Sequence, residues 1–472
     1  MANKNNTAAP GLLRTLRFRD LVLFYVVALV GMRWVAIAAA AGPSALVGWA
    51  IGIVAFFIPM AFTVLELSSR YPEEGGIYVW TKQAFGEFGG FLTGWTYWGS
   101  NLTYLPGMLY FAASSGLFIF GARFAGLQNS GLYFITVSLI GLALAASLNI
   151  IGLKFGKWLN NIGGISTWLS FGVLIVLGLL AMWRFGSATP ITVHSLIPDL
   201  NLKNVMFWSV LAFALAGLES SSFMGDEIQE PRRNIPRAIL VSGLIVAAIY
   251  ILGTMAVLVA LPSNQISGLS GFMDAVVAIG ARLGLNGVGP VIAALIVINM
   301  MGGVSLWLAA IARLPFVAGI DNYLPRVFGK LHPRYGTPYV ALWLQVLVAA
   351  VCAILGQAGA SPKAAYNILV SLGIIAYFLP YLAMFAALIK LQSEPAALGV
   401  MRVPGGKPVA VFMGIMGFAT SLISCVLAAF PPSGTAEPVW YVIKVVGLSL
   451  LLVISGVITY VLRRKYVIES AG

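Results

Sequence analysis

Long, uninterrupted apolar segments dominate the chain, and short polar segments separate them. A transmembrane helix needs about 20 mostly apolar residues in a row, whereas a transmembrane strand needs about 9–11 residues that alternate in polarity. The apolar segments here are continuous, so they predict helices. We expect twelve spans, at 20–43, 45–68, 87–118, 131–151, 163–184, 204–225, 237–260, 288–314, 338–356, 365–389, 409–430 and 439–462.

The polar separators carry the proline, glycine and charged residues that are typical of loops, as in 71–76, 230–236 and 430–434. None of them is long enough to form a second domain. The pattern therefore predicts one membrane domain at 20–462, with an N-terminal tail at 1–19 and a C-terminal tail at 463–472.

The composition excludes a water-soluble globule. Of the 472 residues, 60% are hydrophobic and 9% are charged, and the mean hydropathy is +0.94. Ordinary soluble domains have about 25% charged residues. So large an excess of apolar side chains needs an apolar solvent, and we expect a multi-pass, all-α membrane protein.

The formal net charge of +13 is distributed in a way that indicates topology. Lys and Arg favour the cytoplasmic side of short membrane loops. Most of the 28 Lys and Arg fall into alternate loops and both tails, which predicts that both termini are cytoplasmic. Because the basic residues are spread over many separate segments, we expect no nucleic-acid partner.

The residue types that usually carry enzyme chemistry are scarce and scattered. His194 and His332 fall in or beside loops on opposite sides of the membrane, and Cys352 and Cys425 lie within predicted spans. They cannot form a shared metal site, and the chain has neither a nucleophile–base pattern nor a phosphate-binding glycine loop. We therefore predict no enzyme activity, no metal and no cofactor.

Two charged residues lie near the middle of predicted spans: Arg33 in 20–43 and Glu219 in 204–225. A charge at the bilayer centre costs at least about 2.5–3.5 kcal/mol, so such residues usually mark a functional site. An interhelical structural pair is the alternative for Arg33. For Glu66, within about a turn of the end of span 45–68, an interfacial or helix-packing role is an equally good interpretation.

Both central charges lie beside residues that weaken a helix. Gly31 precedes Arg33, while Gly217 and three serines flank Glu219. Two discontinuous helices, five spans apart, indicate an inverted-repeat transporter in which the broken ends face the ligand. Free N–H groups suit a carboxylate and free C=O groups suit an ammonium, so a zwitterion would satisfy both.

Four stretches resemble the amino acid–polyamine–organocation superfamily of transporters: 66–80 with Phe85-Gly86, 213–219, 226–238, and 320–325 with 336–338. The resemblance implies alternating access in the cell membrane around a central amino-acid site. It also implies a five-plus-five inverted repeat with discontinuous first and sixth helices. The repeats would cover about 20–184 and 204–389, with peripheral helices at about 409–462.

The resemblance also suggests site residues. Phe213 matches a gating aromatic residue, Trp307 an aromatic residue beside the substrate, and residues of the third span match the cavity wall. The candidate substrate-binding residues are Gly31, Met32, Arg33, Trp34, Tyr97, Asn101, Tyr104, Phe213, Ala216, Gly217, Glu219 and Trp307.

The chain departs from the superfamily pattern at two places. Many members have Gly-Ser/Thr-Gly in the first span, where this chain has Gly31-Met32-Arg33, and an Arg could grip a carboxylate there in place of backbone groups. Proton-coupled relatives place a Lys in the fifth span at the position of Thr167. A Lys-based proton step is therefore not expected, which favours exchange.

These features predict a secondary active amino acid transporter, and Arg33 points to acidic substrates. Segments 56–60 and 104–111 resemble the glutamate/4-aminobutyrate antiporter branch. Two alternatives remain open. A polyamine or other amine permease would use Glu219, and 40–43 has some likeness to that group. A non-transporting amino-acid sensor would keep the same fold. The exact substrate, the coupling ion and the oligomeric state are not predicted.

Overall fold

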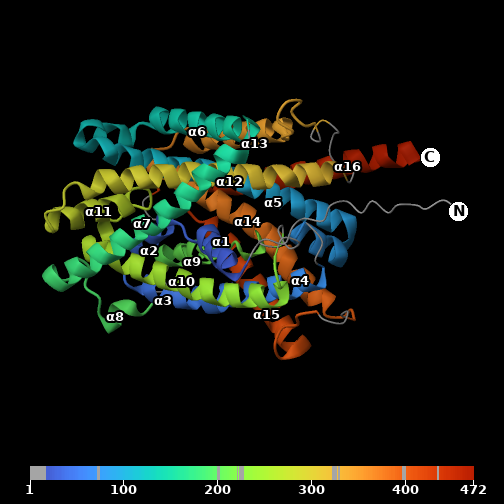
Figure 1. Ribbon diagram of the computed structural model, residues 1–472, viewed down its shortest axis with the longest axis horizontal. Coiled ribbons are helices and arrows are strands. Elements are labelled where there is room, and N and C mark those ends of the chain that lie inside the picture. Colours follow the sequence, from blue (N-terminus) through green and yellow to red (C-terminus); the bar gives the residue numbers. More distant parts are fainter. Residues whose placement is uncertain are drawn as a thin grey trace.

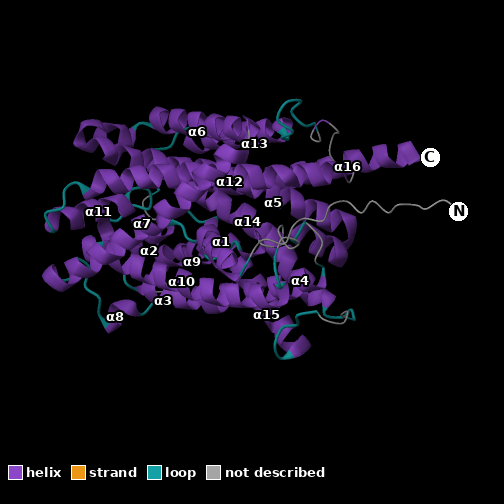
Figure 2. Cartoon of the chain, in the orientation of Figure 1, coloured by secondary structure: helices purple, strands orange, loops and turns teal. Residues whose placement is uncertain are grey.

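The computed structural model describes residues 17–471 except 72–74, 152, 199–201, 221, 223–227, 321–326, 328–329, 396–399 and 433–434. The regular elements of this part of the chain are helices (Figure 2). The long helical elements are α1 (Phe18–Leu29), α2 (Met32–Ala40), α3 (Ser44–Gly52), η1 (Ile53–Phe57), α4 (Ile58–Arg70), α5 (Ile77–Leu117), α6 (Gly131–Ile151), α7 (Leu153–Phe185), α9 (Leu202–Ala214), α10 (Pro231–Ala260), α12 (Val288–Ile320), α13 (Tyr339–Gln357), α14 (Pro362–Leu391), α15 (Gly406–Ala428) and α16 (Pro438–Ala471).

Ten helices within the described ranges are long and apolar enough to cross a membrane, and α1 with α2 form a further, bent span. The predicted span 204–225 corresponds to α9 and the residues that follow it. Its apolar helical stretch, Phe207–Ser220, is shorter than a span, and residues 221 and 223–225 lie outside the described residues. The total of twelve spans and the cytoplasmic position of both termini therefore stay predictions. Residues 1–16 of the predicted N-terminal tail also lie outside the described residues.

Four shorter elements lie between the spans: η2 (Phe118–Asn129), α8 (Val193–Leu196), η4 (Ser263–Gln265) and α11 (Gly271–Arg282). The sequence analysis missed α11. This helix is too short to span a bilayer, but Phe272, Val276 and Ile279 recur on one face and are buried. That face packs against α2, α7, α10 and α12.

The helix α5 begins ten residues before the span predicted at 87–118. Its first part is separated from the rest by Gly86, whose φ of +77° interrupts the helix at the place where the predicted span begins. Phe85 and Phe88, on either side of this kink, are exposed. The predicted span thus begins at the kink, and the helical segment before it carries one charged residue, Lys82.

The first span is broken. Between α1 and α2 the chain bends by 47° at Val30 and Gly31. A Cβ at Gly31 would lie 2.6 Å from the indole of Trp34, so only glycine fits this close approach. In the sixth span, α9 ends at Ala214, and Gly217 has a φ of +134°, a conformation that glycine readily adopts. Both predicted discontinuities are therefore present.

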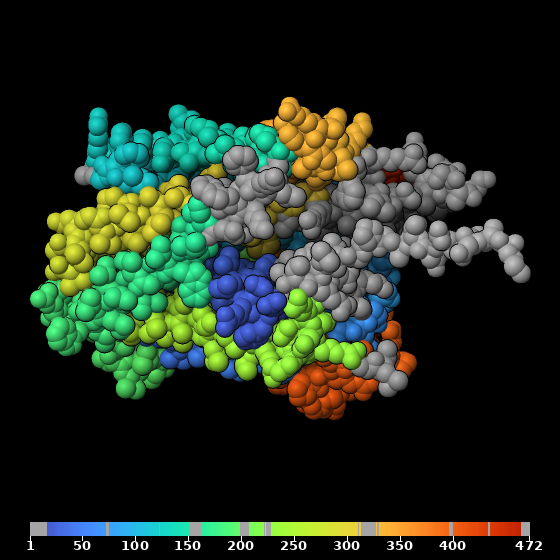
Figure 3. All heavy atoms as spheres, in the orientation of Figure 1, coloured from blue at the N-terminus to red at the C-terminus, as the bar shows by residue number. Residues whose placement is uncertain are grey.

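Two long helices form the centre of the bundle, and the last two spans lie outside it. In the apolar windows of α5 and α14, 78% and 67% of residues are buried, against 28% for α15 and 22% for α16. The helix α5 packs along α14 and α12, and α12 also packs along α7 (Figure 1). The broken helices contact α10: α1 lies beside it on the face shown in Figure 3, where α1 is dark blue.

Candidate substrate site

A cavity lies where the two helix breaks meet the central helices. Its lining residues are Ala28, Leu29, Trp34, Asn101, Tyr104, Phe213, Ala214, Ala216, Trp307 and Tyr377. They come from α1, α2, α5, α12, α14 and from α9 with the break that follows it. The cavity is therefore built by segments from both halves of the chain.

Six of the predicted site residues line this cavity, namely Trp34, Asn101, Tyr104, Phe213, Ala216 and Trp307. The other six are not among the lining residues; these are Gly31, Met32, Arg33, Tyr97, Gly217 and Glu219. Whether any of the twelve binds substrate stays a prediction. The sequence analysis did not name Ala28, Leu29, Ala214 or Tyr377.

Phe213 is the hub of the aromatic wall. Its ring centroid lies 5.3 Å from that of Trp34, 5.9 Å from that of Tyr104 and 5.3 Å from that of Tyr377, each with an edge-to-face geometry. The Tyr104 ring also contacts Trp307, at 6.3 Å. Because Phe213 is the last residue but one of α9, a movement at the break would move this whole wall.

Glu219 is fully buried and is surrounded by tyrosine hydroxyl groups. Its Oε1 accepts hydrogen bonds from Tyr97 at 3.0 Å and Tyr377 at 2.7 Å, and its Oε2 accepts one from Tyr381. In the described part of the chain, no Lys or Arg forms an ion pair with it. Three hydroxyl donors thus replace water around the carboxylate, and they come from two helices, α5 and α14.

Tyr377 and Tyr381 were missed although the sequence carries a signal for them. They lie four residues apart in a long apolar segment, and this spacing places them on one face of a helix. A buried tyrosine hydroxyl usually finds a hydrogen-bond partner, so such a pair indicates a buried acceptor nearby. The signal does not say which acceptor, because Glu219 is far away along the chain.

Arg33 is also buried, with 2% of its surface exposed, but its surroundings are aromatic instead of polar. Its guanidinium carbon lies 4.3 Å from the ring centroid of Trp34 and 4.0 Å from that of Tyr104. Among the described residues, Arg33 has no carboxylate partner, and its Nη2 has no hydrogen-bond partner. Cation–π contacts thus hold the charge next to two residues of the cavity wall.

The backbone groups of the first break are already occupied. The Gly31 N–H donates to the Tyr250 hydroxyl at 3.2 Å, and that hydroxyl lies 2.6 Å from the carbonyl oxygen of Leu29. Met32, the first residue of α2, has no exposed surface. The break therefore offers fewer free backbone donors than its sequence indicates, and Tyr250, which the sequence analysis missed, is the reason.

Thr167 forms a neutral link between the fifth and eighth predicted spans. The Asn299 side-chain amide donates to Thr167 Oγ1 at 2.5 Å and to the Gly163 carbonyl oxygen at 2.9 Å. These bonds join α7 to α12. The position that the sequence analysis compared with a Lys thus carries a neutral threonine, hydrogen-bonded to the neutral side chain of Asn299.

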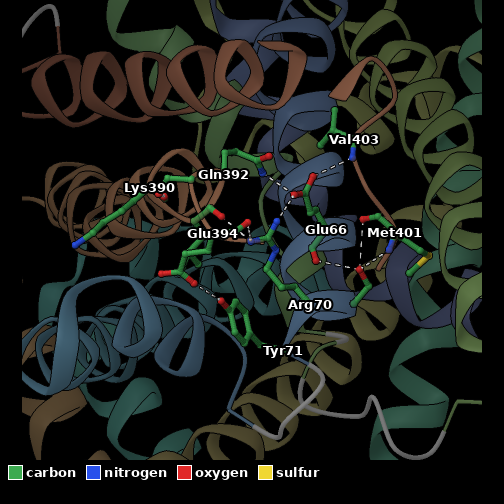
Figure 4. A network of polar contacts seen from close by, with 11 residues as sticks. Glu66, Arg70, Tyr71, Lys390, Gln392, Glu394, Met401 and Val403 are labelled. Carbon is green, nitrogen blue, oxygen red and sulfur yellow. Dashed lines mark hydrogen bonds and ion pairs between the residues drawn. The ribbon is translucent and has the colours of Figure 1, made fainter. Parts of the chain in front are cut away.

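Glu66 has the helix-packing role that was one of its two interpretations (Figure 4). Its Oε1 accepts from Arg70 at 3.4 Å and from Gln392 at 2.5 Å, and its Oε2 accepts from the backbone N–H of Val403 at 2.9 Å. Arg70 in turn donates to the Leu391 carbonyl oxygen at 2.5 Å. The network attaches the end of α4 to the segment that follows α14.

The edge of the same network is more exposed. The Tyr71 hydroxyl donates to the Glu394 carboxylate at 3.2 Å (Figure 4). Partial burial, followed by the charge of Glu394, raises the pKa of Tyr71 above its ordinary value. The hydroxyl therefore remains a donor at neutral pH.

Residues 19–451 match the family model described as amino acid permease. The chain belongs to this family, which is part of the amino acid–polyamine–organocation superfamily. It is 31% identical over 95% of both chains to an uncharacterized transporter of Legionella pneumophila. It is 25% identical to a probable agmatine/putrescine antiporter of Lactococcus lactis, over 84% of this chain and 85% of the relative. A glutamate/gamma-aminobutyrate antiporter of the same organism is 23% identical, over 87% and 82%.

The amino acid permease described here is thus a transporter and a multi-pass protein of the cell membrane. Its family and relatives are transporters, which fits the prediction that it is not an enzyme. The relatives differ in what their names say they carry, so the choice of substrate depends on the residues around the cavity.

Proposed function

We propose that this permease exchanges amino acids across the cell membrane by alternating access, and that its substrates include acidic amino acids. The observation that carries the proposal is the guanidinium of Arg33, which has no carboxylate partner within the described ranges and lies against Trp34 and Tyr104, two residues of the cavity wall. A buried cation without an anionic partner is costly, so a carboxylate that reaches it is stabilised. The fork of the guanidinium suits a carboxylate in particular.

The negative charge of Glu219 does not favour a polyamine substrate. Both oxygens of Glu219 are already hydrogen-bonded by three tyrosines, and Glu219 does not line the cavity. An ammonium group would have to displace these donors before it could pair with the carboxylate. A polycation would also meet the unpaired charge of Arg33. The electrostatics of the wall therefore favour an anion or a zwitterion over a polycation.

The cavity suits a small molecule. The aromatic side chains that line it leave little free space, so the wall must open further to admit an amino acid. In the proposed cycle, Phe213 and Trp307, which both contact Tyr104, close over the substrate, and the helix breaks allow the wall to move. Movement of the broken helices relative to the rest of the bundle opens the site to one side of the membrane at a time.

Exchange, in place of proton symport, is supported by the neutral link at Thr167. Neither Thr167 nor Asn299 changes its charge at physiological pH, so this contact offers no proton for coupling. An antiporter needs no such step, because the returning substrate carries the transporter back.

Counterflow in proteoliposomes tests the proposal. The purified protein is reconstituted with or without unlabelled glutamate inside, and uptake of labelled glutamate is measured at equal outside concentrations. We expect rapid uptake only into loaded vesicles. Equal uptake into empty vesicles would argue against exchange, and loaded vesicles that take up putrescine but no amino acid would support the polyamine alternative. Binding of glutamate without flux would support a sensor.

A further inference from the structure

One tyrosine hydroxyl contacts both helix breaks. Tyr250, on α10, lies with its hydroxyl 2.6 Å from the Leu29 carbonyl oxygen and 3.1 Å from the Ala214 carbonyl oxygen, and it accepts from the Gly31 N–H at 3.2 Å. Leu29 and Gly31 flank the break in the first span, and Ala214 ends α9 before the break in the sixth. Three backbone groups released by two separate discontinuities thus meet at one side chain.

The ring that carries this hydroxyl is held firmly. It is fully buried and stacks on the Trp49 indole of α3, with centroids 4.2 Å apart and planes 5° from parallel. The Trp49 N–H donates to Thr254 Oγ1 at 2.9 Å, one helical turn after Tyr250. Packing between α3 and α10 therefore fixes the position of the hydroxyl independently of its contacts with the two breaks.

The contacts lie directly behind the cavity. Leu29 and Ala214 both line it, whereas Tyr250 does not. Backbone groups freed by a broken transmembrane helix must find partners inside the protein, since lipid offers none. The hydroxyl has one proton, which it can donate to only one carbonyl oxygen at a time. The carbonyl oxygens of Leu29 and Ala214 therefore share a single donor.

We propose that Tyr250 is a positioning residue that joins the two helix breaks into one unit and so sets the spacing of the cavity wall at Leu29 and Ala214. The inference rests on the proposed function for its effect on transport, but its effect on the backbone does not depend on any substrate. A movement of one break relative to the other must break a bond to this hydroxyl. The first and sixth spans therefore move together with α3 and α10.

The variant Tyr250→Phe removes the hydroxyl and keeps the ring. We expect the amides in segments 28–34 and 212–217 to exchange with deuterium at least tenfold faster than in the parent protein, as measured by mass spectrometry of peptides. In proteoliposomes we expect KM to rise on the order of tenfold for acidic and neutral substrates alike, with a smaller change in the maximal rate. A similar rise in KM for the two kinds of substrate would distinguish Tyr250 from Arg33, because Arg33 is expected to discriminate between acidic and neutral substrates.

Two matched variants control for the loss of a buried hydroxyl. The Tyr366 hydroxyl is buried without a hydrogen-bond partner among the described residues, and the Tyr133 hydroxyl donates to the Ala113 carbonyl oxygen at 2.9 Å, between α6 and α5. Tyr366→Phe and Tyr133→Phe should leave deuterium exchange of the amides at both breaks unchanged, even if Tyr133→Phe lowers the Tm. The proposal would be overturned if amide deuterium exchange in Tyr250→Phe matched that of the parent protein, or if the two controls showed an equal increase in exchange rate.

A milder variant covers the case in which Tyr250→Phe does not fold. Thr254→Val removes the partner of Trp49 and should accelerate exchange at 28–34 to a smaller extent, and no acceleration would contradict the proposal. The two proposals fail in different ways. A parent protein that takes up no amino acid, together with faster exchange in Tyr250→Phe, would refute the proposed function and keep the role of Tyr250. Normal counterflow by the parent protein, together with parent-like KM and parent-like deuterium exchange in Tyr250→Phe, would keep the proposed function and refute the role of Tyr250.

Discussion

Arg33 and Glu219 are two buried charges that the protein stabilises in different ways. Three tyrosine hydroxyls donate to Glu219, so its carboxylate keeps the hydrogen bonds that water would have provided. Arg33 receives two aromatic faces, which attract a cation, and its Nη2 has no hydrogen-bond partner among the described residues. A desolvated cation–π contact contributes about 2 kcal/mol, less than the cost of burying a charge, so Arg33 retains the capacity to bind an anion.

Substitution of Arg33 tests this difference at the scale of one residue. In Arg33→Ala we expect counterflow of glutamate to fall at least tenfold more than counterflow of a neutral amino acid, because one positive charge and its forked donors are lost. Arg33→Lys should retain part of the preference, since it keeps the charge. Initial rates and KM for both substrates in proteoliposomes provide the measurement.

Arg123 offers the matched control. It stacks on Phe124 at 5.5 Å but is exposed and does not line the cavity. Arg123→Ala should therefore leave the ratio of the two substrates unchanged. An equal loss for glutamate and the neutral amino acid in Arg33→Ala would indicate that Arg33 has a structural role.

At the scale of elements, helices are interrupted at the cavity, whereas the end of α4 is held by a network of hydrogen bonds. The helices α1, α2 and α9 end or begin at the cavity, and their free backbone groups meet Tyr250. The end of α4 is attached instead to residues 391–403 through both oxygens of Glu66, through Arg70 and through Ser69, which accepts from the Met401 N–H at 2.9 Å (Figure 4). This attachment should keep the end of α4 and the end of α14 together during any movement of the wall.

Glu66→Gln tests the attachment. The substitution removes the charge from a pair in which the side chains of Glu66 and Arg70 are only 1% and 7% exposed. Loss of one partner of a buried pair costs about 3–5 kcal/mol, so we expect a clearly lower Tm in detergent, measured by scanning fluorimetry. Glu230→Gln is the control, because its pair with Arg233 is exposed and should matter little. A parent-like Tm in Glu66→Gln would show that the network is not stabilising.

At the scale of the whole molecule, the orientation in the membrane follows from where the basic residues lie. The helices provide the length and apolar surface to cross a bilayer, but geometry by itself does not distinguish inside from outside. Basic loops stay in the cytoplasm, so the segment around Arg334 is expected inside and α8 outside.

Cysteine labelling tests the orientation. Val193 is 83% exposed on α8, and Arg334 is exposed in the segment before α13. We expect a membrane-impermeant maleimide to label Val193→Cys in intact cells, and to label Arg334→Cys only after permeabilisation. The parent protein should remain unlabelled in intact cells, because Cys352 and Cys425 lie in the spans α13 and α15. Labelling of Arg334→Cys in intact cells would reverse the predicted topology.

The sequence by itself determined the properties that depend on neighbouring residues. Continuous apolar runs set the spans, glycine set both breaks, and the isolation of Arg33 and Glu219 in apolar surroundings marked them as unusual. Each of these is a local effect of backbone conformation or of transfer into lipid, so it can be recognised within a window of about 20 residues.

Only the tertiary structure decided which distant groups meet. It brought Tyr97, Tyr377 and Tyr381 to Glu219, placed Tyr250 between the two breaks, and left Arg33 against aromatic rings instead of a carboxylate. Such partners are separated by 36 to 221 positions along the chain, and no local pattern selects among the many buried tyrosines and carbonyl groups. Their pairing depends on how the helices pack, because most buried polar groups find their partners within one close-packed arrangement.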